Sequence, residues 1–140
     1  MNKQIIVPLD MDHDKAIELA KCFNPELCRL KVGNQLFTSS GPKIIEELNA
    51  LGYEIFLDLK FHDIPNTVEK GIKAIEKLSP KFTTIHISGG DEMMEAATKN
   101  KNKTKILGVS MLTSLNDKQI QKYYFKNKVN LVIEKYVKYA

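Results

Sequence analysis

Along the whole chain, apolar segments of strand length alternate with segments whose apolar residues recur at the helical period. Strands are expected to begin near residues 5, 28, 55, 83 and 106, and this spacing of roughly 25 residues is the length of one strand–helix unit. Such alternation is typical of a parallel sheet, either open and doubly wound or closed into a barrel. The expected strands cover residues 5–9, 27–32, 55 onward, 82–87 and 106–111.

The helices between these strands follow from the apolar period and from residues that favour helix starts. Asp12 or Asp14, Ser40, and Asn66 or Thr67 are expected to cap successive helices. The apolar residues of the expected helix faces are Ala16, Ile17, Ala20 and Phe23; Ile44, Ile45, Leu48 and Leu51; Val68, Ile72 and Ile75; Met93, Met94 and Ala97; and Val129, Val132, Ile133, Tyr136, Val137 and Ala140.

Polar residues lie at or near the ends of several different strands, namely Asp10, Lys31, Asp58 with Lys60, and Thr113. A (β/α)8 TIM barrel collects functional side chains at the C-terminal ends of its strands. The Gly-x-Gly-x-x-Gly fingerprint of an open dinucleotide-binding sheet does not occur in the sequence. We therefore predict an α/β fold of the TIM-barrel type. A complete barrel needs at least ~200 residues, so residues 1–140 are expected to form one incomplete barrel domain of about five βα units.

The segment from Phe56 to Thr67 carries the densest set of charged residues near a strand end. Asp58 and Lys60 are two residues apart, which puts both side chains on one face of a strand, and Asp63 follows closely. Two nearby carboxylates favour the ammonium form of Lys60, which makes it a poor Schiff-base nucleophile and a good cation and proton donor. A structural ion-pair network is the alternative reading of the same residues.

The stretch Asp58-x-Lys60-x-x-Asp63-Ile64-Pro65-Asn66-Thr67 resembles the signature of the orotidine 5′-phosphate decarboxylase family. Four further segments are similar to strands of that family: residues 7–10, 28–33, 86–90 and 111–114. The resemblance covers nearly all of this chain but only the N-terminal part of the family barrel. Strands six to eight, with the Gln- and Arg-bearing loops that grip the substrate phosphate, are not matched.

The resemblance implies a carboxy-lyase that converts orotidine 5′-monophosphate to uridine 5′-monophosphate in pyrimidine biosynthesis, without cofactor or metal. Lys31, Asp58, Lys60 and Asp63 match the family's catalytic array. Lys60 would stabilise the carbanion at C6 of the pyrimidine and then protonate it. Asp58 would lie against the departing carboxylate and hold Lys60 charged and in position.

The resemblance also implies contacts to the rest of the substrate and to a second subunit. Asp10 and Lys31 match residues that contact the ribose, and Thr113 matches a contact to the pyrimidine. Asp63 and Thr67 match residues that reach into the partner subunit's site, which implies a homodimer. Without the phosphate-gripping loops, binding energy from the remote phosphate is lost, so the activity of this chain is expected to be weak or undetectable.

Taken without the resemblance, several of these residues have plainer readings. Asp10 suits a loop or cap, and Lys31 suits a solvated strand end. His62 is interpreted as a turn residue, and His86 as a residue that makes a hydrogen bond at its strand end.

Composition narrows the class of protein. The net charge is +4 and the pI is near 9.0, but the only dense lysine cluster, residues 99–103, is expected to be a solvated loop and no nucleic-acid site. No apolar run reaches the ~18 residues of a membrane span, and the N-terminus does not resemble a secretory signal. Cys22 and Cys28 lack metal or redox spacing and are expected to be reduced, as in a cytoplasmic protein.

Two other functions stay open at this stage. One is a related phosphosugar decarboxylase that uses a metal ion, such as the keto-gulonate phosphate decarboxylases; the residues Ile64 to Thr67 argue against it, and a magnesium dependence would argue for it. The other is a non-catalytic remnant that folds only as an oligomer or not at all. The hydrodynamic size of the chain with and without nucleotide distinguishes that case.

Overall fold

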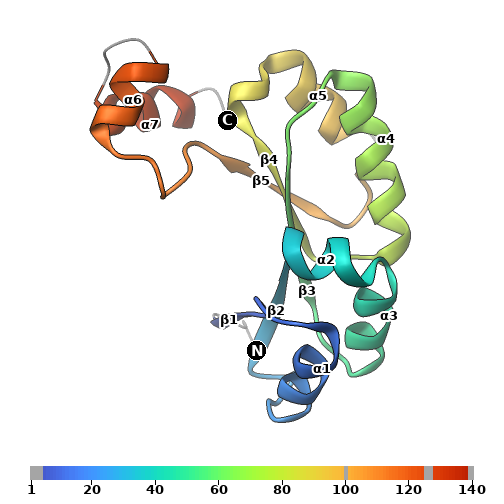
Figure 1. Ribbon diagram of the computed structural model, residues 1–140. Helices are drawn as coiled ribbons and strands as arrows, with labels where there is room; N and C mark the ends of the chain where they lie inside the picture. The colour runs from blue at the N-terminus through green and yellow to red at the C-terminus, as the bar shows by residue number, and fades with distance from the viewer. Residues whose placement is uncertain (1–4, 100, 125–127, 139–140) are drawn as a thin grey trace.

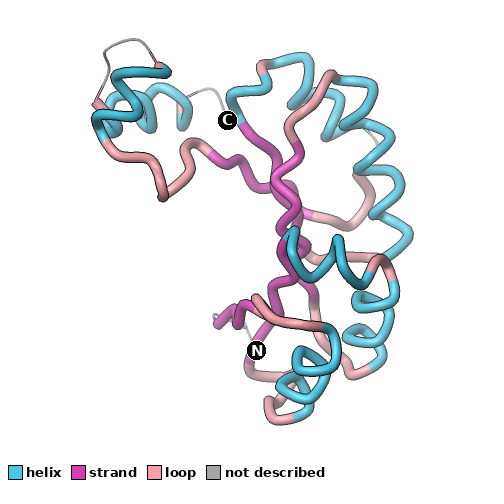
Figure 2. The backbone as a smooth tube through the Cα atoms, viewed as in Figure 1, coloured by secondary structure: helices cyan, strands magenta, loops and turns pink. Residues whose placement is uncertain are grey.

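The computed structural model describes residues 5–99, 101–124 and 128–138. Ala140, expected on the last helical face, and Asn100 of the lysine-rich loop lie outside the described residues. Five parallel strands form one sheet in the order β1-β2-β3-β4-β5, which runs in magenta through the middle of Figure 2. The strands are β1 (Ile5–Pro8), β2 (Cys28–Gly33), β3 (Ile55–Phe61), β4 (Phe82–His86) and β5 (Lys105–Val109).

The helices follow the strands in regular alternation, as the sequence predicts. Figure 1 shows α2 to α5 on one side of the sheet. The helical elements are α1 (His13–Lys21), α2 (Asn34–Ser40), α3 (Lys43–Ala50), α4 (Pro65–Ile75), the 3-10 turns η1 (Glu76–Leu78) and η2 (Ile87–Gly89), α5 (Asp91–Lys99), α6 (Asp117–Tyr123) and α7 (Val129–Val137).

Strand order distinguishes a barrel wall from a doubly wound sheet. In a doubly wound sheet the strand order reverses and helices cover both faces. Here each strand pairs with the next one along the chain from β1 to β5, all in parallel. The predicted α/β fold with about five βα units is confirmed, and its winding is that of a partial (β/α)8 barrel.

The core lies between the sheet and its helices. Along β2, Cys28, Leu30 and Val32 are buried while the residues between them are less so, because successive side chains of a strand point to opposite faces. The fully buried side chains that fill the core include Leu30, Val32, Ile44, Ile45, Leu48, Ile55, Leu57, Val68 and Ile72. Arg29 and Lys31, which alternate with these buried residues, therefore point to the other face of the sheet.

Three expectations about helix starts are corrected. Residues 34–40 form α2, which the sequence did not predict, so Ser40 ends a helix and Pro42 precedes the next one. Helix α4 begins at Pro65, ahead of Asn66 and Thr67, because the fixed φ of proline suits the first helical position. Asp12 stands at the N-cap of α1 but its side chain makes no capping hydrogen bond.

Some expected helix faces extend past the helix itself. Phe23 and Leu51 follow the last residues of α1 and α3 and are exposed. Gly52, two residues past the end of α3, has a φ of +88°, a conformation that glycine adopts without strain.

The C-terminal helices α6 and α7 lie beyond the end of β5, apart from α2 to α5 (Figure 1). Asn116 and Gln119 form a capping box at the start of α6. On α7, Val132 is buried, as its helical spacing predicts, whereas Val137 is 66% exposed. No helix among the described residues is long and apolar enough to cross a membrane.

Candidate active site

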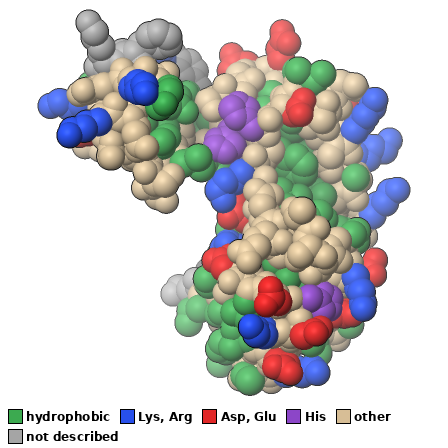
Figure 3. All heavy atoms as spheres, viewed as in Figure 1, with side chains coloured by type: hydrophobic (Ala, Val, Ile, Leu, Met, Phe, Trp, Pro, Cys, Tyr) green, Lys and Arg blue, Asp and Glu red, His purple; other side chains and the backbone are tan. Residues whose placement is uncertain are grey.

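Four predicted site residues meet at the C-terminal ends of β1, β2 and β3. The Nζ of Lys60 donates a hydrogen bond to Oδ2 of Asp58 at 2.7 Å. The Nζ of Lys31 lies 4.0 Å from the same oxygen and 3.2 Å from Oδ1 of Asp10. The four side chains thus alternate in charge, Asp10–Lys31–Asp58–Lys60, and we call them the charged array. Figure 3 shows acidic and basic side chains together with histidines in the hollow beside the α6–α7 pair.

The backbone of β3 is irregular where it carries this array. Leu57 pairs with Thr83 and Phe61 pairs with Ile85, so β3 has two more residues than β4 between these pairings. Lys60 lies in this interval with a φ of +50°, a left-handed conformation that costs a non-glycine residue about 1–2 kcal/mol. A strained backbone of this kind persists only where the surroundings hold it.

Thr84 of β4 supports the array, and sequence reasoning missed it. Its Oγ1 donates to Oδ1 of Asp58 at 2.8 Å and accepts from the backbone N–H of Lys60 at 2.9 Å. The only sequence signal is that Thr84 stands two residues before His86 and so shares a strand face with it. That signal is weak because the adjacent Thr83 is the same residue type. Only the irregular register of β3 against β4 determines which of the two hydroxyls reaches Asp58 and Lys60.

The carboxyl group of Asp58 is nearly enclosed, with 12% of its side chain exposed. Burial on its own would raise the pKa of Asp58, since it disfavours the charged form. The hydrogen bonds from Lys60 and Thr84, together with the charges of Lys60 and Lys31, outweigh burial and lower the pKa below its ordinary value of 3.8. Asp58 is therefore a carboxylate at neutral pH.

Three predicted site residues lie away from the charged array. Asp63 is exposed and its Oδ1 accepts the backbone N–H of Ile64 at 2.7 Å; within the described chain it makes no ion pair with Lys60, contrary to the expectation that two carboxylates flank this lysine. Thr67 is exposed in the first turn of α4. Thr113 is exposed after β5, and no described hydrogen bond joins it to the array.

Two histidines lie beside the array, His62 just after β3 and His86 at the end of β4. The rings of His62 and His86 stack with centroids 4.9 Å apart. Burial, followed by the nearby His62 and Lys60, lowers the pKa of His86, with Asp58 acting in the opposite direction. In place of the hydrogen bond expected for His86, the described residues give it this ring contact.

The opposite end of the same sheet face is closed by packing and ion pairs. The guanidinium of Arg29 bonds to Glu54 at 2.8 Å and lies over the ring of Phe82, 5.4 Å from its centroid. Phe56 packs edge-on against Phe82, and Lys81 lies 3.1 Å from Glu54. The charged side chains at this end are thus paired with one another or packed on an aromatic ring, and the charged array lies at the strands' other, C-terminal ends.

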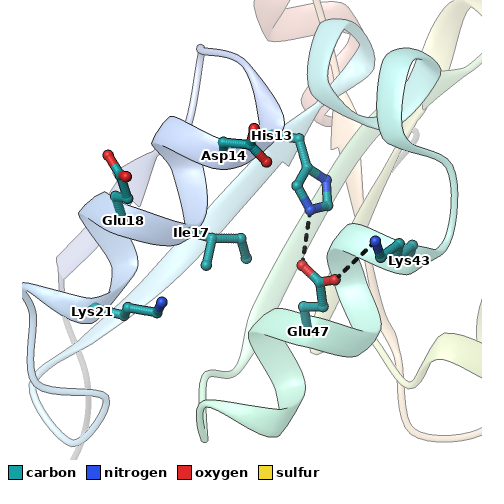
Figure 4. A pocket seen from close by; sticks show the side chains of 7 residues that line it. All are labelled: His13, Asp14, Ile17, Glu18, Lys21, Lys43 and Glu47. Atoms are coloured by element: carbon teal, nitrogen blue, oxygen red, sulfur yellow. Dashed lines mark hydrogen bonds and ion pairs between the residues drawn. The ribbon is translucent and has the colours of Figure 1, made fainter.

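A second polar cleft, of about 410 Å³, lies between α1 and α3. Figure 4 shows His13 of α1 pointing to Glu47 of α3; their side chains are 2.9 Å apart, and Lys43 lies 3.4 Å from the same carboxylate. The contact between His13 and Glu47 joins α1 to α3, and the pair between Lys43 and Glu47 lies within α3. Both contacts stabilise the fold. Among the described residues, no group of three or more His, Cys, Asp or Glu side chains is arranged to hold a metal ion.

A family model and individual relatives of this chain point to the same protein family. Residues 3–139 match the family described as orotidine 5′-phosphate decarboxylase / HUMPS. The orotidine 5′-phosphate decarboxylase of Saccharophagus degradans is 44% identical over 123 residues, which are 84% of this chain and 52% of that protein. The enzyme of the same name from Marinomonas sp. is 46% identical over 122 residues, with 83% and 52% covered.

A solved structure agrees with these relatives. The crystal structure of orotidine 5′-phosphate decarboxylase from Lactobacillus acidophilus superposes with a TM-score of 0.86 at 33% identity, covering 96% of this chain and 65% of that one. The chain spans about half the length of the curated relatives it matches.

Proposed function

This chain belongs to the orotidine 5′-phosphate decarboxylase / HUMPS family, and on that premise we propose that it decarboxylates orotidine 5′-monophosphate to uridine 5′-monophosphate in pyrimidine biosynthesis. The observation that carries the proposal is the ion pair between Lys60 and Asp58, 2.7 Å apart, with Lys31 beside it. A fixed ammonium at the ends of barrel strands suits a reaction that develops negative charge on carbon.

The proposed reaction needs one bond broken and one formed. The bond between C6 of the pyrimidine and its carboxylate breaks, carbon dioxide leaves, and the electron pair stays on C6. The ammonium of Lys60 stabilises that charge and then gives its proton to C6, after which the amine takes a proton from solvent. Asp58 keeps the ammonium oriented, and Asp10 and Lys31 bind the ribose. Thr113 contacts the pyrimidine.

We propose that the site is shared between two copies of the chain. Asp63 and Thr67 match family positions that serve the partner's site, and in this chain both are exposed at the start of α4. Equal mixing of inactive Lys60→Ala and Asp63→Ala chains tests this. In half of the resulting dimers, one of the two sites has both residues intact, so about a quarter of wild-type activity is expected. Activity no higher than that of the separate variants would contradict a shared site.

The reaction is tested by following uridine 5′-monophosphate formation by ultraviolet absorbance, with EDTA present. We expect slow turnover that EDTA does not change, since no step of the proposed chemistry uses a metal. Turnover of a sugar phosphate that needs magnesium, with none of orotidine 5′-monophosphate, would instead identify a related metal-dependent decarboxylase. Neither activity, with a hydrodynamic size unchanged by nucleotide, would identify a non-catalytic remnant.

We also propose that residues 1–140 act as one incomplete barrel domain in the cytoplasm. The buried core runs without interruption from α1 to α5, which favours a single unit. Cys22 and Cys28 are both free, as is usual in a reducing compartment.

A further inference from the structure

The hydroxyl group of Thr84 makes two hydrogen bonds, and its donor and acceptor roles in them are determined by its partners. Its Oγ1 lies 2.9 Å from the backbone nitrogen of Lys60 and 2.8 Å from Oδ1 of Asp58. A backbone N–H can only donate, so the oxygen of Thr84 accepts from Lys60, and its single hydrogen is left for the carboxylate of Asp58. Thr84 is 5% exposed, so water does not compete readily for these bonds.

Both bonds act where the sheet is irregular. The backbone of Lys60 has a φ of +50° and falls between the pairings of Leu57 and Phe61 with β4. At this irregular position the hydroxyl of Thr84, in place of a backbone carbonyl of β4, accepts the hydrogen bond from the backbone N–H of Lys60. It thereby holds the peptide from which the Lys60 side chain extends. The same hydroxyl occupies Oδ1 of Asp58, while Oδ2 faces the ammonium groups of Lys60 and Lys31.

We propose that Thr84 is a positioning residue of the active site: its hydroxyl fixes both the Asp58 carboxylate and the Lys60 backbone, so that the ammonium of Lys60 is held where the reacting carbon will lie. This inference rests on the proposed decarboxylase function. Thr84 touches no reacting atom in this account and acts only through its two neighbours.

The adjacent Thr83 provides a matched control. It is also buried, and its Oγ1 donates a hydrogen bond to β3, but to the backbone oxygen of Leu57 at 2.9 Å. Thr83→Val and Thr84→Val therefore each remove one buried hydroxyl that links β4 to β3. Only the second removes contacts to the charged array.

Two measurements on the purified chain test the proposal: turnover of orotidine 5′-monophosphate, and titration of the Asp58 carboxyl group by ¹³C NMR. Loss of the Thr84 hydroxyl removes a hydrogen bond to the charged form, so in Thr84→Val the pKa of Asp58 should rise. We expect kcat to fall about ten-fold or more, with a smaller change in KM. Thr84→Ser keeps the hydroxyl and should restore both values.

Thr83→Val should leave kcat and the Asp58 titration as in the wild type, even where it lowers stability. The proposal is overturned if Thr83→Val lowers kcat as far as Thr84→Val does, or if Thr84→Val leaves the Asp58 titration unchanged. Should the valine variant not fold, Thr84→Ala is measured against Thr84→Ser in the same way. A wild-type chain without turnover, but with the titration shift present, would contradict the turnover proposed for this chain while upholding the contact to Asp58.

Discussion

Replacing Asp58 by asparagine removes one negative charge and keeps the shape of the side chain. In the wild type this carboxylate lies 2.7 Å from the ammonium of Lys60 and 4.0 Å from that of Lys31. In Asp58→Asn both ammonium groups lose their shared counter-charge in a partly enclosed site. We therefore expect the variant to be less stable than the wild type as well as inactive.

The magnitude follows from how enclosed the pair is. Breaking a fully buried ion pair by removing one partner costs about 3–5 kcal/mol, and an exposed pair contributes under about 1 kcal/mol. The Asp58 side chain is 12% exposed and that of Lys60 is 34% exposed, so the pair lies between these limits. We expect Asp58→Asn to lower the free energy of unfolding by about 2 kcal/mol.

Urea unfolding followed by circular dichroism measures this difference. With a slope of about 2 kcal/mol per molar, the midpoint should fall by about 1 M with the slope unchanged. The difference also depends on pH, because the pKa of Asp58 is lowered in the folded state. It is fully present above the ordinary value of 3.8 and is lost as the pH falls through the lower folded-state pKa.

An asparagine variant as stable as the wild type at pH 7, or more stable, would mean that desolvation of Asp58 outweighs its contacts with Lys60 and Thr84. A stability difference that did not shrink at low pH would show that it comes from shape and not from charge.

Four further substitutions test the fold. Leu57→Ala should lower the free energy of unfolding by about 3 kcal/mol, because Leu57 is fully buried between sheet and helices. Ile64→Ala, at a side chain 66% exposed, should change the free energy of unfolding by under about 0.5 kcal/mol. The urea midpoints of the two variants measure this difference. Gly52→Ala should cost about 1 kcal/mol in the same assay, because a Cβ is disfavoured at a φ of +88°, and an unchanged midpoint would contradict this. Glu47→Gln weakens the contact with His13 and should cost under about 1 kcal/mol without changing turnover; a clear loss of activity would mean that this cleft takes part in the reaction.

The sequence predicted the wall of the barrel well because that wall depends on local periodicity. Buried residues at every second position of β2, such as Leu30 and Val32, fix the faces of the strand. The same face rule, with the i, i+2 spacing, predicted that Asp58 and Lys60 point to one side. Their ion pair confirms that placement, although the left-handed backbone of Lys60 was not predictable from the spacing.

What the sequence did not indicate depends on contacts between distant segments. The role of Thr84 follows from the irregular register of β3 against β4, and a register between strands leaves no local pattern in the chain. Helices α2 and α6 each have a single buried apolar residue, Leu36 and Ile120, so they lack the repeated apolar spacing that marked the remaining helices. Helix α4 starts at Pro65 since backbone geometry there outweighs the capping preference of Asn66.

The most direct test of the proposed role of Lys60 is the turnover of orotidine 5′-monophosphate by the purified chain and by its Lys60→Ala variant, both made in a host without its own decarboxylase. A Lys43→Ala variant, which changes an exposed lysine of α3 that pairs with Glu47, serves as the matched control. We expect slow formation of uridine 5′-monophosphate by the wild type and the Lys43→Ala chain, and none by Lys60→Ala. Equal turnover with and without Lys60 would contradict that role.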